Sequence, residues 1–209
     1  MAYKIKLFVL GSVSTNCYLL YQEDTRKAVL FDPADRADVI LDFINEKQLK
    51  LEAILLTHGH FDHIGAAQEI AKQCQAAIYG HELEAEIVSD TTLNLSAIMG
   101  RTAISLQLDK TLRDGDEIDA AGFHFQALHT PGHTPGGVCY YLEKEKLLFC
   151  GDTLFAGSVG RSDFPKGSYA ELIRSIREKL LQLPGETQAF PGHGEQTTIG
   201  YEQTHNPFI

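Results

Sequence analysis

Short apolar runs alternate with polar turns along the whole chain, and their spacing predicts strands in two separate stretches. The expected strands cover residues 4–10, 17–21, 27–31, 53–56 and 76–79 in the first half, and 123–128, 137–142, 146–149 and 189–190 in the second. Apolar positions at helical spacing predict helices over 38–46, 64–74 and 169–183. Residues 81–108 are expected to be helical or irregular, and 114–117 to form a turn. Strands and helices that recur in two halves favour sheets packed face to face with helices outside.

The composition indicates one globular domain. No internal repeat, low-complexity tract or Pro/Ser-rich linker divides the 209 residues, so we expect a single domain over 1–209. Eighteen Lys and Arg against 28 Asp and Glu give a formal charge of −10, without a clustered basic stripe. That balance disfavours a nucleic-acid partner and a polybasic membrane anchor.

Compartment signals favour a cytoplasmic protein without a membrane segment. The N-terminal apolar run ends at Gly11 without a small-residue cleavage site, so we expect no signal peptide. The apolar runs are far shorter than the roughly 20 residues that cross a bilayer. Four cysteines without a Cys-x-x-Cys pair are typical of buried apolar residues in a reducing compartment.

Nine histidines are the unusual entry in the composition, and they are densest in His58-Gly59-His60-Phe61-Asp62-His63. Imidazoles and a carboxylate suit Zn²⁺, and also Fe or Mn. His58 and His60 lie two apart in an extended segment and so point to one side, and Asp62 and His63 turn back toward that side at a helix entry. A solvated loop without a metal does not explain such a cluster directly after the apolar run 54–56.

Three later residues extend this set. His133, Asp152 and His193 each follow or precede an expected strand beside glycine, where folds carry functional loops. Together with the first cluster they make five histidines and two aspartates, a set that can hold two divalent ions around a shared water. Zn²⁺ is the favoured ion, with Fe or Mn as alternatives.

With these residues in this order, the chain resembles the metallo-β-lactamase-fold hydrolases over nearly its full length. Residues 151–155 (GDTLF) and 157–161 (GSVGR) are similar to the glyoxalase II (hydroxyacylglutathione hydrolase) branch. The resemblance implies an α/β fold, a four-layer αββα sandwich with the site at one edge of the sheets. It implies one metal on His58, His60 and His133, the other on Asp62, His63 and His193, and Asp152 bridging both.

The resemblance further implies a metal-dependent hydrolase of a small-molecule thioester or ester, S-D-lactoylglutathione first, with a metal-bridging hydroxide as nucleophile. Asp62 and Asp152 would be catalytic as well as ligands, since Asp62 could also orient the water. In this branch a basic residue at Arg161 contacts the glutathione part, so we expect a carboxylate anchor there, with an ordinary surface arginine as the alternative. Only residues 194–209 follow His193, so we expect a short form without the C-terminal helical region of full-length glyoxalase II.

Several alternatives stay open at this point. A persulfide dioxygenase with one iron keeps similar motifs, and another small ester or lactone is an equally simple substrate. A secreted β-lactamase is disfavoured by the expected lack of a signal peptide. A non-enzymatic binding module is disfavoured because all the ligand positions are retained.

The remaining polar residues near the motifs have weaker interpretations. Asp32 either accepts a hydrogen bond from a ligand histidine or belongs to an ordinary Asp-Pro turn. His81 and His205 are expected to face solvent, and His124 to face away from its phenylalanine neighbours. His129 is expected to pack within its strand, with support of the ligand four residues later as the alternative.

Overall fold

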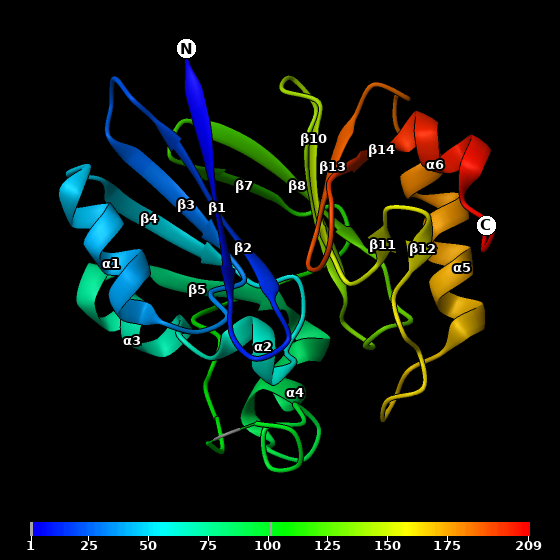
Figure 1. Cartoon of the computed structure of the whole chain (residues 1–209), viewed down its shortest axis with the longest axis horizontal. Helices are drawn as coiled ribbons and strands as arrows, with labels where there is room; N and C mark the ends of the chain where they lie inside the picture. The colour runs from blue at the N-terminus through cyan, green and yellow to red at the C-terminus, as the bar shows by residue number, and fades with distance from the viewer. Residues whose placement is uncertain (1, 101) are drawn as a thin grey trace.

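Two six-stranded sheets stack face to face in the computed structural model, with helices on both outer faces (Figure 1). The structure describes residues 2–100 and 102–209. Two residues of the expected domain lie outside the described residues: Met1, and Arg101 of the 81–108 stretch. This four-layer αββα arrangement confirms the predicted α/β fold class.

The first sheet is built from the N-terminal half of the chain. Its strands, in spatial order, are β1 (Tyr3–Leu10), β2 (Thr15–Gln22), β3 (Lys27–Phe31), β4 (Lys50–Leu55), β5 (Ala77–His81) and β6 (Lys110–Leu112). The β1–β2–β3 pairs are antiparallel and the β3–β4–β5–β6 pairs are parallel. Helices α1 (Ala37–Glu46) and α3 (Ala67–Cys74) make the parallel crossovers and cover the outer face.

The second sheet comes from the C-terminal half. Its spatial order is β14 (Thr197–Thr198), β13 (Gln188–Pro191), β10 (Leu147–Gly151), β9 (Val138–Leu142), β8 (Phe123–His129) and β7 (Glu117–Ala120). Among the described residues of this second sheet, only β10 and β13 pair in parallel, and α5 (Tyr169–Glu178) lies between them in the chain. Helix α5 and helix α6 (Ile199–His205) cover the outer face, and a hairpin of β11 (Leu154–Phe155) and β12 (Ser158–Val159) lies beside them.

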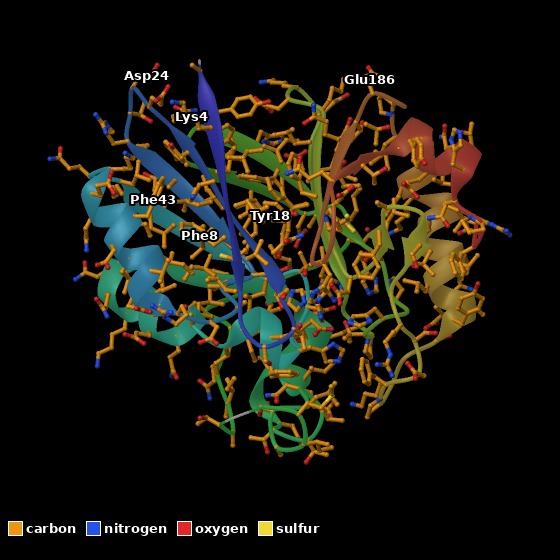
Figure 2. The ribbon with its side chains drawn as sticks, viewed as in Figure 1. Lys4, Phe8, Tyr18, Asp24, Phe43 and Glu186 are labelled. Carbon is orange, nitrogen blue, oxygen red and sulfur yellow. The ribbon has the colours of Figure 1, made fainter. Side chains whose placement is uncertain are left out.

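Side chains alternate between two buried layers along the central strands. Every residue of β2 is buried, with Leu19 packed under the helices and Tyr18 between the sheets. Figure 2 shows Phe8 and Phe43 meeting on the helix side, where their ring centroids are 5.6 Å apart. Between the sheets, Phe31 stacks on Phe149 with centroids 3.8 Å apart. Burial on both faces explains why these strands appear as short, nearly continuous apolar runs.

Most predicted elements are present, and several boundaries are wrong for reasons of tertiary contact. The helix expected over 64–74 is divided into α2 (Phe61–Ile64) and α3 at Ala66, whose amide donates to the carbonyl of Pro33 instead of continuing the helix. Gly65 passes close to the neighbouring loop, since a β-carbon there would lie 2.2 Å from the carbonyl oxygen of Ala34. The helix expected over 169–183 ends at Glu178 and continues as the 3₁₀ turn η2 (Leu180–Gln182).

Other elements were missed because their apolar signal is weak. The strand at 189–190 is not the last, since β14 and α6 follow it. Strands β6 and β7 are short and carry few apolar residues, and the strands of the β11–β12 hairpin have only two residues each. Residues 82–89 form η1 (Glu82–Glu84) and α4 (Ala85–Ser89), which agrees with the expectation of helical or irregular structure over 81–108. Within residues 2–100 and 102–209, no helix has the length and apolar character needed to cross a bilayer.

Candidate metal centre

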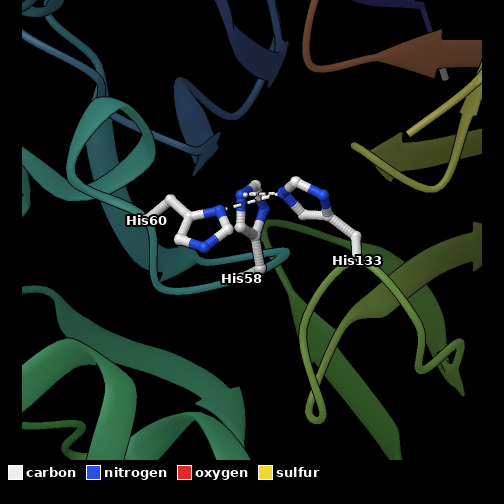
Figure 3. Close-up of side chains that lie close together, drawn as sticks. All are labelled: His58, His60 and His133. Atoms are coloured by element: carbon white, nitrogen blue, oxygen red, sulfur yellow. Dashed lines mark hydrogen bonds between the residues drawn. The ribbon is translucent and has the colours of Figure 1, made fainter. Parts of the chain in front are cut away.

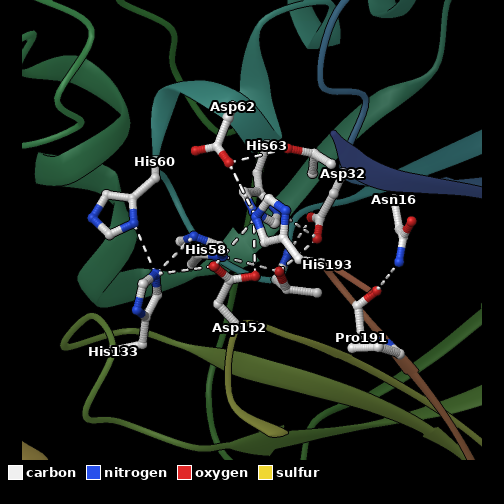
Figure 4. Close-up of polar contacts among 12 residues, drawn as sticks. Asn16, Asp32, His58, His60, Asp62, His63, His133, Asp152, Pro191 and His193 are labelled. Atoms are coloured by element: carbon white, nitrogen blue, oxygen red, sulfur yellow. Dashed lines mark hydrogen bonds and ion pairs between the residues drawn. The ribbon is translucent and has the colours of Figure 1, made fainter. Parts of the chain in front are cut away.

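Loops that follow strands of both sheets bring the seven predicted side chains together at one sheet edge (Figure 4). The chain leaves β4 through His58 and His60, and α2 then carries Asp62 and His63. In the second sheet, His133 lies in the turn between β8 and β9, Asp152 follows β10 and His193 follows β13. Residues far apart in sequence meet here because the ends of β4, β10 and β13 lie at this edge.

His58, His60 and His133, here called the three-histidine group, form one buried set (Figure 3). The Nε2 atom of His133 lies 2.9 Å from Nδ1 of His60 and 3.2 Å from Nε2 of His58. Burial lowers the pKa of His58 and of His60 well below the usual value, and neighbouring imidazoles add to this shift. Neutral rings with converging lone pairs are the form that binds a metal.

Hydrogen bonds fix which ring nitrogen of two of these histidines faces the centre. The Nδ1 atom of His133 donates to the carbonyl of Arg161 at 2.6 Å. The Nδ1 atom of His58 lies 3.1 Å from the hydroxyl of Thr57, which itself donates to Asp32. With each Nδ1 proton engaged in this way, each Nε2 lone pair is free to face the centre.

Asp62, His63 and His193, here called the second group, lie beside the first. The Oδ2 atom of Asp62 is 3.3 Å from Nε2 of His193 and 3.5 Å from Nε2 of His63. Asp152 lies between the two groups, with Oδ1 3.4 Å from His63 Nε2 and Oδ2 3.6 Å from His133 Nε2. One carboxylate therefore reaches both sets of ligand atoms.

Two atoms at the centre have no partner although they are buried. Among the described residues, His63 Nε2 and Asp152 Oδ1 make no hydrogen bond, and they face each other at 3.4 Å. A buried polar atom left unpaired costs about 1–3 kcal/mol, so this spot calls for a further group. A cation bound by nitrogen and carboxylate oxygen satisfies both atoms, and the donor set is one that Zn²⁺ or Fe accepts. The residues therefore fit a dinuclear metal centre.

Asp32 orients residues of this centre through hydrogen bonds to His63 and Thr57. Its Oδ2 accepts from His63 Nδ1 at 3.0 Å and from the Thr57 hydroxyl at 2.6 Å, and its Oδ1 accepts from the Thr57 amide at 2.7 Å. Asp32 thus accepts from His63, one of the predicted ligand histidines. Burial lowers the pKa of His63, but three carboxylates, of Asp62, Asp152 and Asp32, outweigh it and raise the value to about 10. The same negative charge favours a bound cation.

Sequence reasoning missed the β1–β2 hairpin as a support of the site. The hydroxyl of Thr15 donates to Asp62 Oδ2 at 3.0 Å. The side-chain amide of Asn16 donates to the carbonyls of Pro191 at 3.0 Å and Gly194 at 2.9 Å, on either side of His193 (Figure 4). Two polar residues directly before an apolar strand were the only signal in the sequence.

A cavity of about 360 Å³ opens over the centre. Besides five of the ligand residues, it is lined by Val13, Phe61, Leu95, Met99, Phe155, Arg161 and Phe164. A larger hollow of about 740 Å³, between α3 and residues 105–109, has no cluster of metal-ligating groups and is open. The smaller cavity combines the predicted His and Asp ligands with apolar side chains, so it is the candidate substrate site.

The structure places Arg161 at the rim of this cavity. Its guanidinium pairs with Asp163 at 2.9 Å and lies over the ring of Phe164, 4.3 Å from the centroid. The side chain is 62% exposed, so a substrate carboxylate can compete with Asp163 for it. The backbone role of Arg161, as acceptor for His133, could not be predicted from its residue type.

The expectation that His81 faces solvent is wrong. His81 is buried, and its ring stacks on that of His129 with centroids 4.0 Å apart. It ends β5 and its Nδ1 accepts from the amide of Leu83, which orders the following turn. The Nε2 atom of His129 lies 2.8 Å from the carbonyl of Pro135, in the turn that carries His133. His124 and His205 are exposed, as expected.

Comparison with known proteins identifies the class of protein. Residues 10–193 match the metallo-beta-lactamase superfamily, and the chain belongs to that superfamily. It is 40% identical over 200 residues to the probable metallo-hydrolase YqgX of Bacillus subtilis, covering 95% of this chain and 94% of that protein. It is 37% identical over 207 residues to the hydroxyacylglutathione hydrolase GloC of Haemophilus influenzae, covering 98% and 97%.

Solved structures agree with this membership. BLEG-1 B3 metallo-beta-lactamase superposes with a TM-score of 0.94 at 41% identity, over 98% of this chain and 99% of that one. TTHA1623 in a di-iron-bound form gives 0.85 at 37%, over 98% and 100%. ETHE1 from Myxococcus xanthus gives 0.78 at 32%, over 98% and 83%. The protein is therefore an enzyme of the metallo-hydrolase type with a small-molecule substrate.

Proposed function

We propose that this protein is a dinuclear metal-dependent hydrolase of small thioesters or esters, in the short glyoxalase II-like branch, with S-D-lactoylglutathione as its first substrate. The observation that carries the proposal is the convergence of seven His and Asp side chains on the partnerless atoms His63 Nε2 and Asp152 Oδ1. The similarity to GloC along 97% of that protein supports this branch. In this proposal residues 1–209 act as one domain.

Each residue has an assigned part. The three-histidine group would hold one ion and the second group the other, and the Asp152 carboxylate reaches ligand atoms of both groups. Two divalent ions, when bound there, would supply an activated water and polarise the carbonyl of the substrate. We favour Zn²⁺; similarity to a di-iron form of TTHA1623 supports iron as the alternative.

The chain's own residues position the reactants. Asp62, held by the Thr15 hydroxyl at 3.0 Å, keeps a carboxylate oxygen beside the centre that can accept a proton from a water and so orient it. Phe155 and Phe164 wall the cavity and exclude solvent from the acyl group. Arg161 exchanges Asp163 for a carboxylate of the substrate, which fixes the far end of the leaving thiol.

A second candidate is β-lactam hydrolysis, which the similarity to the BLEG-1 B3 metallo-beta-lactamase favours. It uses the same metal chemistry on an amide instead of a thioester. The two candidates differ in what fills the cavity, so a panel of substrates separates them.

The test is a metal count on the purified protein followed by assays of S-D-lactoylglutathione, a simple lactone, a chromogenic cephalosporin and glutathione persulfide with an oxygen electrode. We expect close to two ions per chain and fastest turnover of the thioester. Oxygen uptake with the persulfide and one iron per chain, without hydrolysis, would establish the dioxygenase instead. Fastest turnover of the lactone or the cephalosporin would keep the metal chemistry and overturn the thioester substrate.

A further inference from the structure

A fully buried carboxylate lies next to the site without belonging to the seven predicted ligands. Glu84 ends η1, directly after β5, and is 1% exposed. Burial raises the pKa of Glu84 to about 7, against the lowering effect of hydrogen bonds that include the amides of Gly59 and Gly136. A carboxylate is costly to bury unless its oxygens are well paired, so its partners indicate what it does.

Those partners are two backbone amides in the two loops that carry the three-histidine group. The Oε2 atom accepts from the amide of Gly59 at 2.6 Å, between His58 and His60. The Oε1 atom accepts from the amide of Gly136 at 2.8 Å, three residues after His133. The loop with Gly59 follows β4 of the first sheet, and the loop with Gly136 joins β8 and β9 of the second sheet. The Glu84 carboxylate therefore links the two sheets beside the ligands.

Both amides belong to glycines, and the close approach requires this. A β-carbon on Gly59 would lie 2.9 Å from Glu84 Oε2 and equally close to methyl groups of Ile87 and Val88. A β-carbon on Gly136 would lie 2.8 Å from Glu84 Oε1. The carboxylate and the two glycines are therefore matched to each other sterically as well as by hydrogen bonds.

We propose that Glu84 is a positioning residue that clamps loops 58–60 and 133–136 together, so that the three-histidine group is assembled before its ion binds. This inference rests on the proposed metal centre and not on the identity of the substrate. The clamp acts through backbone groups, and Glu84 itself ligates no metal.

Glutamine at this position separates the clamp from simple filling of space. Glu84→Gln keeps the size of the side chain but offers one acceptor oxygen and an NH₂ group, so one of the two glycine amides faces another donor. Changing a group that orients a metal ligand typically lowers metal affinity about 10- to 100-fold, and we expect a loss of that size for one of the two ions.

The matched control is Glu202→Gln. Glu202 is also fully buried, and it accepts from the amide of Gly157 at 3.0 Å, from Thr197 and from Asn206, none of which lies in a ligand loop. The experiment titrates Zn²⁺ into the metal-free chain against a chelator of known affinity, for wild type and both variants. We expect only Glu84→Gln to bind one ion more weakly, whatever the variants do to thermal stability. Equal Zn²⁺ affinities in the two variants would overturn the clamp.

A second measurement needs no variant, should Glu84→Gln fail to fold. Amide hydrogen exchange on metal-free wild type reports whether the loops are held in the absence of ions. We expect the Gly59 and Gly136 amides to remain protected; exchange at the rate of open loops would overturn the proposal. Neither readout uses a substrate, so an inactive protein that still protects these amides would refute the proposed function and leave the clamp standing.

Discussion

Asp32 shows how much a single residue contributes to the site without touching the cavity. Its carboxylate takes three hydrogen bonds, from His63 and twice from Thr57, and it does so from a left-handed backbone conformation with φ of 46°. Non-glycine residues in this region are uncommon and gather at functional sites, where the surroundings hold them. The sequence motif Asp32-Pro33 suggested either a turn or a ligand support, and the backbone geometry could not be predicted from it.

Asp32→Asn tests this support with little backbone cost, since asparagine tolerates a positive φ. Asparagine has one acceptor oxygen, so it cannot keep the bonds that both carboxylate oxygens make: either the Thr57 amide, or His63 Nδ1 with the Thr57 hydroxyl, would face its NH₂ group. We expect affinity for one of the two ions to fall about 10- to 100-fold. Hydrogen bonds to a charged group are worth about 1.5–3 kcal/mol each, so the free energy of unfolding should also fall by about that amount. Zn²⁺ titration and urea denaturation measure the two effects. The exposed Asp35→Asn is the control, and wild-type Zn²⁺ affinity in Asp32→Asn would contradict this role.

His60→Ala removes one member of the three-histidine group, and His60 lines the cavity over the centre. We expect bound metal per chain and hydrolytic turnover to fall together, because the group loses one of its three nitrogen ligands. Elemental analysis and the thioester assay on the same preparation give both values. The exposed His205→Ala should change neither, and a His60→Ala variant with wild-type turnover would show that the site has been assigned wrongly.

At the scale of elements, the turn between β8 and β9, which carries His133, packs against α5. Gly132 has φ of 139°, and a β-carbon there would lie 2.3 Å from the backbone nitrogen and Cα of Leu172 in α5. The carbonyl of Gly132 also accepts from the amide of Ser168, which caps that helix. The backbones of α5 and of this turn are therefore in direct contact. His133 is the next residue after Gly132, so this contact also positions His133.

Gly132→Ala should therefore lower the free energy of unfolding by about 2–4 kcal/mol, since the clash is with backbone and cannot be relieved by a rotamer change. Gly115→Ala is the comparison, because Gly115 has φ of 81° but open space around a β-carbon, and only the conformational cost of about 1–2 kcal/mol applies. Urea denaturation of the two variants measures the difference. A Gly132→Ala variant as stable as Gly115→Ala would contradict the close packing of α5 on this turn.

Elements with a clear apolar period could be predicted from sequence, and elements set by tertiary contact could not. The strand Lys27–Phe31 has the predicted bounds, and α1 differs by one residue. Helix α6 was missed because only Ile199 and Glu202 are buried along it, and one of these is charged. Glu84 was missed for the same reason, since a charged residue in an irregular stretch gives no signal of burial.

At the scale of the molecule, both sheets contribute to a centre that neither could form alone. Polar residues after strands predicted which side chains take part, because strand ends at one sheet edge share a location. Their division into two groups came from a family resemblance, since spacing along the chain does not say which loops meet. The three apolar core clusters among the described residues include none of the seven predicted ligands, so we expect the fold to form without the ions.

Removing the metal should therefore weaken the protein without unfolding it. An ion present at 100 times its dissociation constant adds about 2.7 kcal/mol, which corresponds to roughly 5–10 °C in a chain of this size. We expect chelation to lower the melting temperature by that amount and to leave the circular dichroism at 25 °C unchanged. Loss of the folded signal on chelation at 25 °C would show that the metal holds the fold together.

The central claim is that hydrolysis depends on ions held by the seven His and Asp residues. The most direct measurement is the rate of S-D-lactoylglutathione hydrolysis by the metal-free chain as Zn²⁺ is added in known ratios. We expect no turnover without metal and a rate that rises until about two ions are bound per chain. Full activity of the metal-free chain, or no activity with two ions bound, would contradict the claim that hydrolysis depends on these ions.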